Sequence, residues 1–545
     1  MKRTVIIGGV AGGMSAATRL RRLDENQEIV IIEKGPYVSF ANCGLPYYVS
    51  GEISDREKLL VQTPESLKAR FNLDVRPFSE ATEINSEKKQ VTIKSAESTY
   101  ELSYDQLILS PGAKPFIPPL NGLEEADNIF TLRNVPDVDK IMDSLETTKP
   151  KKAVVVGAGF IGLEMAENLA KRGLEVTIVE FASHVLPTVD DEMAAFIHNE
   201  LVDNGIIVHT EKGVVEIEDK GRTLILNTGE KIETDLVILS VGVRPENDLA
   251  ESAGIELGMR GGILVDENYE TSVKDIYAVG DAIIVKNQIT KDDAMIALAS
   301  PANRQGRQVA DVIAGMPRKN KGSIGTAIVR VFNQSIASTG LTEKQLKDLN
   351  YNFSIVHIDG KNHAGYYPNA SMVFLKLLFN GKTGELYGAQ AVGKDGVDKR
   401  IDIIATAIKG GLTVEDLPEL ELTYAPPFGS AKDVVNMAGY AALNIMEGIS
   451  QNIQLHELEE VKNSGAVLVD VRTAAEFERG NIPGFVNFPL NNLRDSMSEL
   501  PKNKEIILSC HSGQRSYIAS RMLEQHGFKV KNLDGSYLLY EAVNR

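Results

Sequence analysis

The sequence predicts an α/β fold of several domains, each built around a sheet of buried parallel strands. Two segments, which begin near residues 4 and 152, show the same succession of apolar strand, glycine-rich turn, helix and second apolar strand. A third strand–loop–helix pattern spans residues 505–525. Strands that alternate with helices form parallel sheets, so these three patterns together predict an α/β protein. The 545 residues are enough for three or four domains, at about 150 residues per domain.

Composition and charge exclude several classes of function. The net charge of −17 argues against nucleic acid as a partner. No apolar run approaches the ~18 residues that a membrane-spanning helix needs, and no signal-peptide pattern follows Met1. The two cysteines, Cys43 and Cys510, are too far apart for a disulfide framework or a zinc site. We therefore expect a cytoplasmic protein without a metal and without a membrane partner.

The first glycine turn has the form Thr-Val-Ile-Ile-Gly-Gly-Val-Ala-Gly-Gly, residues 4–13. Gly8 permits the turn and Gly13 permits close packing of helix on strand, so that the helix N-terminus directs its amides at a pyrophosphate. Glu33 lies 20 positions after Gly13 and can accept a hydrogen bond from a ribose hydroxyl. Val10 departs from the pattern, because a middle glycine is usual there. The context predicts a dinucleotide-binding unit.

The second glycine turn, residues 152–162, has all three glycines: Gly157, Gly159 and Gly162. The strand that follows its helix ends at Glu180. A carboxylate there bonds both hydroxyls of an unphosphorylated adenosine ribose and repels a 2′-phosphate. The pattern favours NADH and leaves NADPH open.

Further motifs connect the two units. Strands ending in small-residue turns occur at residues 107–113 and 236–245, and residues 271–281 read Thr-Ser-Val-Lys-Asp-Ile-Tyr-Ala-Val-Gly-Asp. In order and spacing, residues 1–445 resemble the pyridine nucleotide–disulfide oxidoreductases. The resemblance implies that the first unit binds FAD and that the second, inserted within it, binds NAD(P)H. The implied FAD residues are Gly8, Val10, Ala11, Gly13, Glu33, Lys34, Ala113, Gly280, Asp281 and Ala299, and the implied NAD residues are Gly157, Gly159, Phe160, Ile161, Gly162, Glu164, Glu180 and Gly242.

Cys43 lies in Ser-Phe-Ala-Asn-Cys-Gly-Leu-Pro-Tyr, with no second cysteine near it. Many members of the family use a Cys-x4-Cys pair, whereas a single thiol is limited to a sulfenic acid or a mixed disulfide with a small thiol. The segment is similar to the single-cysteine branch, which contains NADH oxidases, NADH peroxidases and coenzyme A–disulfide reductases. Oxidases and peroxidases of this branch usually carry a histidine in the first glycine turn, where this chain has Ala11.

The form Gly-x-Val-Ala-Gly-Gly is similar to the coenzyme A–disulfide reductases, as are the arginines of the helix that follows it. Arginines beside an anion site suit the phosphates of coenzyme A, although arginines on a helix also form ordinary solvated faces. Arg22 matches the family position and is favoured over Arg21. The resemblance implies a coenzyme A channel lined by Arg19, Arg22, Ser39, Asn42 and Phe71.

The region from 323 to 446 resembles the dimerisation domain of the family. Tyr367 and Tyr424 match two tyrosines that reach the active-site cysteine from the partner subunit, and Tyr366 is the alternative to the first. A phenol can donate a hydrogen bond to a thiolate, whereas packing at the interface is the other explanation for each tyrosine. The match implies a homodimer with shared active sites.

Residues 455–545 resemble rhodanese domains through the Asp-Val-Arg motif at 470–472 and the loop Cys-His-Ser-Gly-Gln-Arg-Ser at 510–516. The strand, loop and helix predict a ring of amides around the sulfur of Cys510, with Arg515 closing it with charge. The resemblance makes Cys510 a carrier of sulfane sulfur. A phosphatase loop has a similar Cys-x5-Arg shape, but the Asp-Val-Arg motif speaks against it.

Together these features predict two Rossmann-like domains for FAD and NAD, an α+β dimerisation domain and a C-terminal α/β rhodanese domain. We expect an NAD(P)H-dependent flavoprotein that reduces coenzyme A disulfide, and also coenzyme A persulfide or polysulfide, through a Cys43–coenzyme A mixed disulfide. The alternatives are an NADH oxidase or peroxidase with a Cys43 sulfenic acid, and a sulfur-relay or redox-sensing protein. The expected boundaries are 1–118 with 246–322 (FAD), 119–245 (NAD), 323–446 (dimerisation), 447–454 (linker) and 455–545 (rhodanese).

Overall fold

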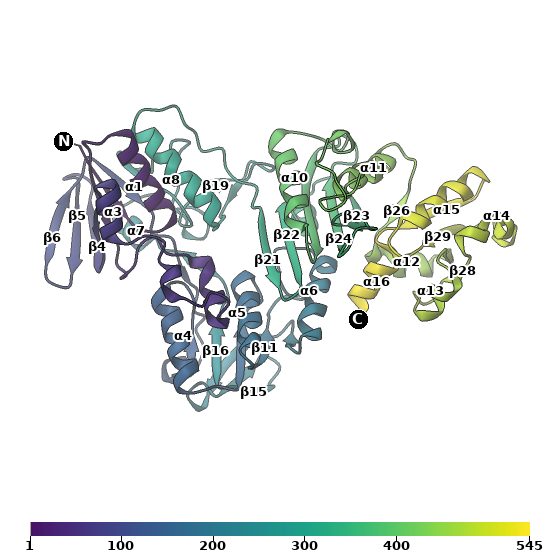
Figure 1. The fold of residues 1–545 in the computed structure, drawn as a ribbon, viewed down its shortest axis with the longest axis horizontal. Coiled ribbons are helices and arrows are strands. Elements are labelled where there is room, and N and C mark those ends of the chain that lie inside the picture. Colours follow the sequence, from purple (N-terminus) through teal and green to yellow (C-terminus); the bar gives the residue numbers. More distant parts are fainter. Residues whose placement is uncertain (1) are drawn as a thin grey trace. The chain divides into compact units, whose positions relative to one another are not determined.

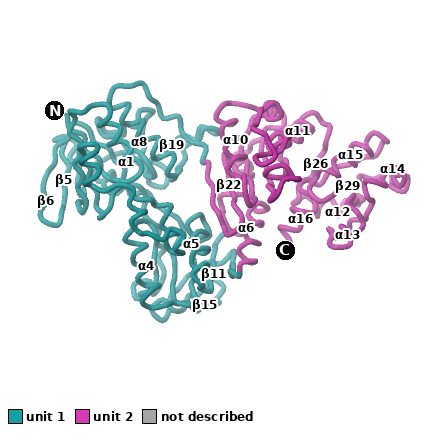
Figure 2. The backbone as a smooth tube through the Cα atoms, viewed as in Figure 1, with its two compact units in different colours: residues 1–182, 205–325 teal, residues 183–204, 326–545 magenta. Residues whose placement is uncertain are grey.

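The computed structural model describes residues 2–545, so Met1, the first residue of the expected FAD domain, lies outside it (Figure 1). The chain divides into two compact units, residues 1–182 with 205–325 and residues 183–204 with 326–545 (Figure 2). Each unit contains two domains. In the part of the chain that the structure describes, no helix is both long and apolar enough to span a membrane.

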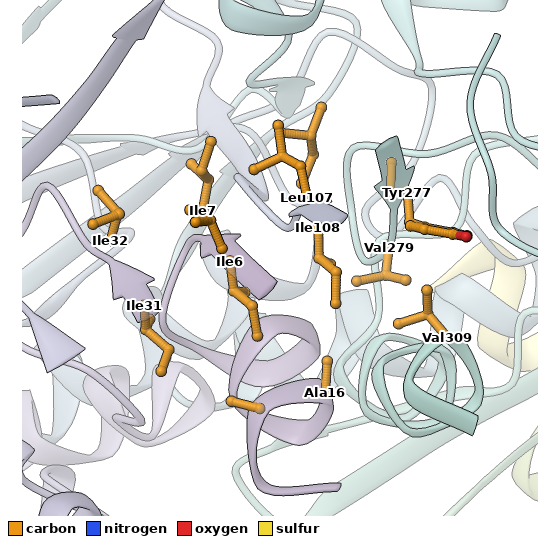
Figure 3. Close-up of a cluster of buried hydrophobic side chains, with 14 of the residues drawn as sticks. Ile6, Ile7, Ala16, Ile31, Ile32, Leu107, Ile108, Tyr277, Val279 and Val309 are labelled. Carbon is orange, nitrogen blue, oxygen red and sulfur yellow. The ribbon is translucent and has the colours of Figure 1, made fainter. Parts of the chain in front are cut away.

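The first sheet of unit 1 is parallel throughout, in the order β18-β7-β1-β2-β3. Its central strands bury nearly every side chain, as a sheet covered on both faces requires. Figure 3 shows Ile6, Ile31 and Ile108 of three adjacent strands in this core. The elements are β1 (Arg3–Ile7), α1 (Ala11–Leu23), β2 (Glu28–Ile32), α2 (Leu45–Ser50), α3 (Pro64–Phe71), β3 (Asp74–Arg76), β7 (Gln106–Leu109), β18 (Ile276–Ala278) and α8 (Ala299–Ile313).

The second sheet of unit 1 is also parallel, in the order β12-β11-β10-β16-β9. All of its strands lie in the sequence between β7 and β18 of the first sheet, so the second domain is inserted within the first. Its elements are β9 (Ile129–Phe130), α4 (Val135–Thr147), β10 (Lys152–Val156), α5 (Phe160–Lys171), β11 (Glu175–Val179), β12 (Ile207–His209) and β16 (Leu236–Leu239).

Small antiparallel sheets and short helices complete unit 1. Two three-stranded sheets have the orders β4-β5-β6 and β13-β14-β15, and two pairs join β17 to β8 and β19 to β20. These elements are β4 (Ser79–Asn85), β5 (Gln90–Ser95), β6 (Thr99–Ser103), β8 (Ala113–Pro115), β13 (Val214–Glu218), β14 (Thr223–Leu226), β15 (Lys231–Glu233), β17 (Val243–Pro245), α7 (Asp248–Ser252), β19 (Val285–Lys286) and β20 (Asp293–Ala294).

The first domain of unit 2 is an antiparallel sheet, β21-β22-β25-β24-β23, with helices packed against it. Strands β24 and β25 are buried along almost their whole length and carry the core of this domain. The elements are α6 (Asp191–Asp203), β21 (Ala327–Val331), β22 (Gln334–Gly340), α9 (Glu343–Asp348), β23 (Ser354–Lys361), β24 (Met372–Phe379), β25 (Leu386–Gly393), α10 (Val397–Gly410) and α11 (Val434–Met446).

The second domain of unit 2 is a parallel sheet in the order β26-β30-β29-β27-β28. Its edge strand β26 (Asn452–Ile453) lies inside the expected linker 447–454, which therefore contributes to the sheet. The predicted α/β class is confirmed by the three parallel sheets. The other elements are α12 (Leu458–Asn463), β27 (Val467–Asp470), α13 (Ala474–Arg479), β28 (Val486–Asn487), α14 (Leu493–Ser496), β29 (Glu505–Ser509), α15 (Gln514–Gln525), β30 (Lys529–Leu533) and α16 (Ser536–Asn544).

Candidate active sites

The first glycine turn joins β1 to α1 with almost no room for side chains. A Cβ on Gly13 would lie 2.0 Å from the carbonyl oxygen of Gly8, so helix and strand pack as the sequence predicted. Helix α1 starts after Val10 without a side-chain cap, which leaves its first amides for an anion. Glu33 accepts hydrogen bonds from the amides of Gly9 (2.9 Å) and Gly35 (2.8 Å). Its carboxylate is thereby held beside the turn.

The other residues assigned to FAD surround this turn or lie at neighbouring strand ends. The amide of Gly280 donates to Gln305 at 2.7 Å, and Asp281 accepts from Arg133 at 3.2 Å. Ala299 begins α8, which also lacks a side-chain cap. Ala11 is the first residue of α1, Ala113 is buried in β8, and Lys34 is exposed and 3.5 Å from Glu246. The uncapped helix ends and the bare glycine turn fit the phosphates of a dinucleotide.

The second glycine turn has a clearer feature of a ligand-binding site. Gly159 has an ordinary φ of −74° and no protein atom within 4 Å of the position where its Cβ would stand. Neither backbone strain nor packing therefore requires a glycine at this position. Close approach of a ligand would require one. Glu180 is buried and accepts from the amides of Ala158 (2.6 Å) and Ala182 (2.8 Å).

The remaining residues assigned to NAD lie around the N-terminal end of α5 and the end of β16. Phe160 and Ile161 form the first turn of α5, and Gly242 follows β16 with a φ of 106°. Glu164, one turn further along α5, accepts a hydrogen bond from the Tyr47 hydroxyl at 3.0 Å. This bond connects the helix of the second glycine turn to the segment after Cys43.

Cys43 is exposed, in a short 3-10 turn (Asn42–Gly44) directly before α2. Partial burial and the carboxylate of Glu164 raise the pKa of its thiol, Arg133 lowers it and Asp281 raises it again. Residues assigned separately to FAD (Asp281) and to NAD (Glu164) thus lie close enough to the sulfur to act on its charge. Sequence reasoning missed Arg133, which belongs to no glycine motif.

The segment before Cys43 is anchored to the first glycine turn. The amide of Ser39 donates to the carbonyl of Gly9 at 2.8 Å, and Ser39 has a left-handed φ of 48°. The side-chain oxygen Oδ1 of Asn42 is buried and has no hydrogen-bond partner within residues 2–545. A buried acceptor of this kind costs stability unless a donor reaches it, so the site fits a ligand with an N–H or O–H group beside Cys43.

The arginines of α1 differ sharply in their surroundings. Arg19 donates to the buried carboxylate of Asp311 at 2.6 Å, and Arg21 is buried and donates to the carbonyls of Phe71 (2.8 Å) and Asn72 (3.1 Å). Arg22 is exposed. Arg19 therefore serves as an ion-pair partner inside the fold, which competes with its assignment to the coenzyme A channel. Phe71 packs partly against the core of the first domain.

The tyrosines assigned to the partner's site are exposed on unit 2. Tyr367 and Tyr424 are 43% and 49% exposed, and Tyr366 is 77% exposed. The hydroxyls of Tyr366 and Tyr424 lie 3.3 Å apart, and this hydrogen bond raises the pKa of Tyr366. The geometry pairs Tyr424 with Tyr366, whereas Tyr367 stacks edge-on against His363. The choice between Tyr366 and Tyr367 stays a prediction.

The loop around Cys510 forms the second thiol site. Cys510 follows β29 and is 1% exposed, and its sulfur accepts from the amide of Gly513 at 3.1 Å and lies 3.3 Å from the Ser516 hydroxyl. Gly513 has a left-handed φ of 113° and begins α15, so the loop turns sharply into the helix. These donors and the helix N-terminus favour negative charge on sulfur.

Arg515, which the sequence predicted to close this loop with its charge, is paired with a carboxylate in the structure. Both of its terminal nitrogens donate to Glu476 of α13 at 2.8 Å. This ion pair raises the pKa of Arg515 and holds that of Glu476 well below its usual range. The positive charge at the mouth of the loop is therefore largely neutralised. Sequence reasoning assigned no role to Glu476.

The Asp-Val-Arg motif of this domain is structural. Arg472 donates to Asp470 from Nε at 2.9 Å and from Nη2 at 2.8 Å, and both side chains are buried. Nη2 also donates to the carbonyl of Gly480 at 2.7 Å. The motif fixes the sheet edge near the loop and takes no direct part at Cys510.

Comparison with known proteins supports this organisation. The model of the pyridine nucleotide-disulphide oxidoreductases matches residues 2–306, that family's dimerisation domain matches 326–434, and the rhodanese-like domain matches 454–542. A coenzyme A disulfide reductase of Staphylococcus haemolyticus is 38% identical over 451 residues, which are 82% of this chain and 100% of that protein.

Two solved structures cover nearly the whole chain. The reduced CoADR-RHD of Bacillus anthracis is 52% identical with a TM-score of 0.98, over 99% of this chain and 98% of that one. An NAD-dependent persulfide reductase from A. fulgidus is 37% identical with a TM-score of 0.94, over 99% and 100%. Proteins of this family work with a flavin and NAD(P)H on a small-molecule substrate. The chain therefore belongs to the pyridine nucleotide-disulphide oxidoreductases, with the coenzyme A disulfide reductases as its relatives, and carries a rhodanese-like domain.

Proposed function

We propose that this protein uses NADH and FAD to reduce coenzyme A disulfide and coenzyme A persulfide, with Cys43 as the thiol that exchanges with substrate. The single observation that carries this proposal is the environment of Cys43. It is a lone exposed thiol, it lies beside the residues assigned to both nucleotides, and the buried Oδ1 of Asn42 next to it lacks a donor within residues 2–545. The amide N–H groups of a pantetheine arm could supply that donor.

A reaction cycle with Cys43 as its only cysteine balances in atoms and electrons. A flavin held at the first glycine turn would relay two electrons from NADH. A Cys43–coenzyme A disulfide that gains two electrons and one proton gives the Cys43 thiolate and coenzyme A thiol. The thiolate then attacks a sulfur of coenzyme A disulfide, displaces one coenzyme A thiol and restores the mixed disulfide. With coenzyme A persulfide, attack on the sulfur bonded to carbon displaces hydrosulfide instead. Glu180 beside the second turn would bond the ribose hydroxyls of NADH.

The rhodanese-like domain extends this chemistry to sulfane sulfur. A persulfide on Cys510 would pass its outer sulfur to coenzyme A thiol, giving coenzyme A persulfide and the Cys510 thiol with no net change of redox state. The hydrogen bond from Gly513 stabilises the Cys510 sulfur as leaving group. A pantetheine arm tethered between two sites raises the effective concentration of the transfer.

A homodimer completes the proposal. The exposed Tyr366, Tyr367, Tyr424 and Phe428 gather on the dimerisation domain, and an apolar aromatic surface of this kind marks an interface. A tyrosine hydroxyl from the partner would donate to the Cys43 thiolate.

The test is a peptide-resolved mass of the protein purified without reductant. A coenzyme A adduct on Cys43 is expected. A sulfenic or sulfinic acid on Cys43 in every preparation, together with NADH turnover that depends on oxygen or peroxide, would assign the protein to the oxidases and peroxidases instead.

The coupled reaction is tested separately with Cys510→Ser. We expect this variant to keep its reduction of coenzyme A disulfide and to lose turnover that starts from a sulfane-sulfur donor and coenzyme A. Unchanged turnover from that donor would remove Cys510 from the pathway.

A further inference from the structure

Unit 2 contains a buried group of charges that neither thiol site uses. The Lys376 side chain on β24 is fully buried, and its Nζ lies 2.8 Å from both Asp190 and Glu343 and also contacts Glu192. His357 faces Lys376 directly across the β23–β24 ladder and is 3% exposed. Two buried cationic side chains thus lie next to each other, within a ring of carboxylates. Buried charges persist only when they are paired.

One more carboxylate of this group comes from the rhodanese domain. Asp534, directly after β30, accepts from the backbone amide of His357 at 3.0 Å and lies 2.8 Å from Nδ1 of its ring. The other ring nitrogen of His357 lies 3.4 Å from Glu192. Gln454 also donates to Asp534 at 3.2 Å. His357 and Asp534 are 177 residues apart in the chain, and they join the dimerisation domain to the rhodanese domain.

The segment that begins at Asp534 also supports the Cys510 loop. Two residues on, the Ser536 hydroxyl accepts from the amide of Cys510 at 3.2 Å. The amide of Tyr537 donates to the Cys510 carbonyl at 3.2 Å, and that of Leu538 donates to the carbonyl of His511 at 2.8 Å. Ser536 holds a left-handed φ of 50°, so this turn is tightly determined. A movement of Asp534 is therefore transmitted to the loop that holds the sulfur.

We propose that His357 is a positioning residue that fixes the Cys510 loop to the dimerisation domain through Asp534 and Ser536, so that sulfur leaves Cys510 in a constant direction. The inference rests on the proposed transfer from Cys510 to Cys43 by way of coenzyme A. The link consists of charged hydrogen bonds. A protonated His357 ring donates to the carboxylates of Asp534 and Glu192 at the same time. A tethered arm delivers its cargo efficiently only when both sites are held in fixed places.

Protonation of the His357 ring strengthens this link, to which the backbone amide of His357 contributes in either state. Burial alone would lower the pKa of its ring, but the carboxylates of Asp534 and Glu192 outweigh burial and raise it to about 9. The other charged groups facing the cluster are Lys376, Asp190, Glu343 and, at its rim, Lys347, which is 2.6 Å from Glu343. When His357 is neutral, the net negative charge of the cluster is larger by one unit than when His357 is protonated. Transfer between the domains should therefore slow at a pH where His357 is neutral.

A second contact, with α6 of unit 2, holds the rhodanese domain when this link is broken. Helix α16 packs on α6, where Asn199 donates to the carbonyl of Ala542 at 2.9 Å and Arg545 pairs with Asp203. The ion pair is about half exposed on both sides. Removing the imidazole charge should thus let the intact Cys510 loop shift relative to the dimerisation domain without releasing the rhodanese domain.

The test compares His357→Gln and Asp534→Asn with wild type in three assays on the full-length holoenzyme. The assays are NADH oxidation with coenzyme A disulfide, sulfur transfer from thiosulfate to cyanide at Cys510, and NADH oxidation with thiosulfate and coenzyme A, which needs both sites. We expect the third rate to fall at least tenfold while the first two stay within twofold. His526→Gln is the matched control, because that ring bonds only to Met522 of its own helix among residues 2–545.

Three outcomes would overturn the proposal. Equal losses in all three assays would show a merely structural role, and an unchanged third rate would show no role. If both variants fail to fold, the wild-type ratio of the third rate to the first is measured from pH 7 to 10, and a ratio that does not fall through pH 9 rejects the link. Absence of the first reaction in wild type would instead reject the proposed function itself.

Discussion

At the scale of single residues, the two cysteines have opposite environments. Cys43 is exposed with a carboxylate near it, and its thiol pKa is raised. Cys510 is buried with an amide aimed at its sulfur. The first thiol is thus open to solvent and the second is enclosed, which suits the large substrate and the single sulfur atom of the proposed function.

Replacing Glu164 with Gln should lower the pKa of Cys43, because a carboxylate near the sulfur disfavours the thiolate. Alkylation of the reduced holoenzyme by iodoacetamide at neutral pH should then become faster. Arg133→Gln is the control of opposite sign and should slow the reaction. Equal alkylation rates in all three proteins would contradict the assigned charges.

Replacing Ser516 with Ala should slow sulfur transfer from thiosulfate by roughly tenfold, since a hydrogen bond to a charged acceptor contributes about 1.5–3 kcal/mol. The hydroxyl is 3.3 Å from the Cys510 sulfur and 3.0 Å from the carbonyl of Gly513, so its single proton serves one of them at a time. Ser520→Ala on the same helix is the control, because that hydroxyl donates to Tyr517. A loss of the same size in the control would point to a general effect on α15.

At the scale of elements, the three arginines of α1 lie in different surroundings. Arg19 and Arg21 face other elements, and Arg22 faces solvent. An α-helix has 3.6 residues per turn, so residues that are neighbours in the sequence lie on different faces of the helix. The same helix therefore packs on α8 and leaves a cation available at its surface.

Arg19→Gln should lower the melting temperature by roughly 4–8 °C, because it leaves the buried Asp311 with Arg318 alone and costs about 2 kcal/mol. Thermal unfolding followed by flavin fluorescence checks this. Arg19→Gln should leave the KM for coenzyme A disulfide nearly unchanged.

Arg22→Gln should show the reverse pattern. An exposed substitution changes stability by about 0.5 kcal/mol or less, whereas loss of a charged hydrogen bond to phosphate should raise the KM for coenzyme A disulfide about tenfold. Steady-state kinetics with the 3′-dephospho substrate as comparison measures this effect. An unchanged KM would place the phosphates elsewhere.

At the scale of the whole molecule, the rhodanese domain is joined to the rest of unit 2 by contacts of two kinds, one to the dimerisation domain and one to α6. The buried cluster around Lys376 and His357 depends on protonation, and the ion pair of Arg545 with Asp203 depends on salt. The covalent connection between α11 and β26 is short, at residues 447–451. These contacts set how firmly Cys510 is held.

The stabilising effect of His357 should be lost at high pH. Its folded pKa of about 9 lies above the unfolded value of 6.5, so the contribution is complete below pH 6.5, declines as the pH rises and is gone above 9. Cleavage after the exposed Glu447 by a glutamate-specific protease should accelerate over this range. His357→Gln should be cleaved at a rate that does not change over this pH range. A wild-type cleavage rate that is flat from pH 6.5 to 9.5, after correction for the protease's own pH profile, would contradict this.

The sequence by itself determined the parallel sheets, the two glycine turns and both thiol loops, because each depends on local backbone constraints, such as the 2.0 Å that would separate a Cβ on Gly13 from the carbonyl oxygen of Gly8. It also located Glu33 and Glu180 at strand ends. Only the tertiary structure showed that Arg515 is neutralised by Glu476, that Arg19 pairs with Asp311, and that Asp534 meets His357. Side-chain charge pairs join residues far apart in the chain, and no periodicity or spacing in a single sequence specifies which of many carboxylates a cation will meet.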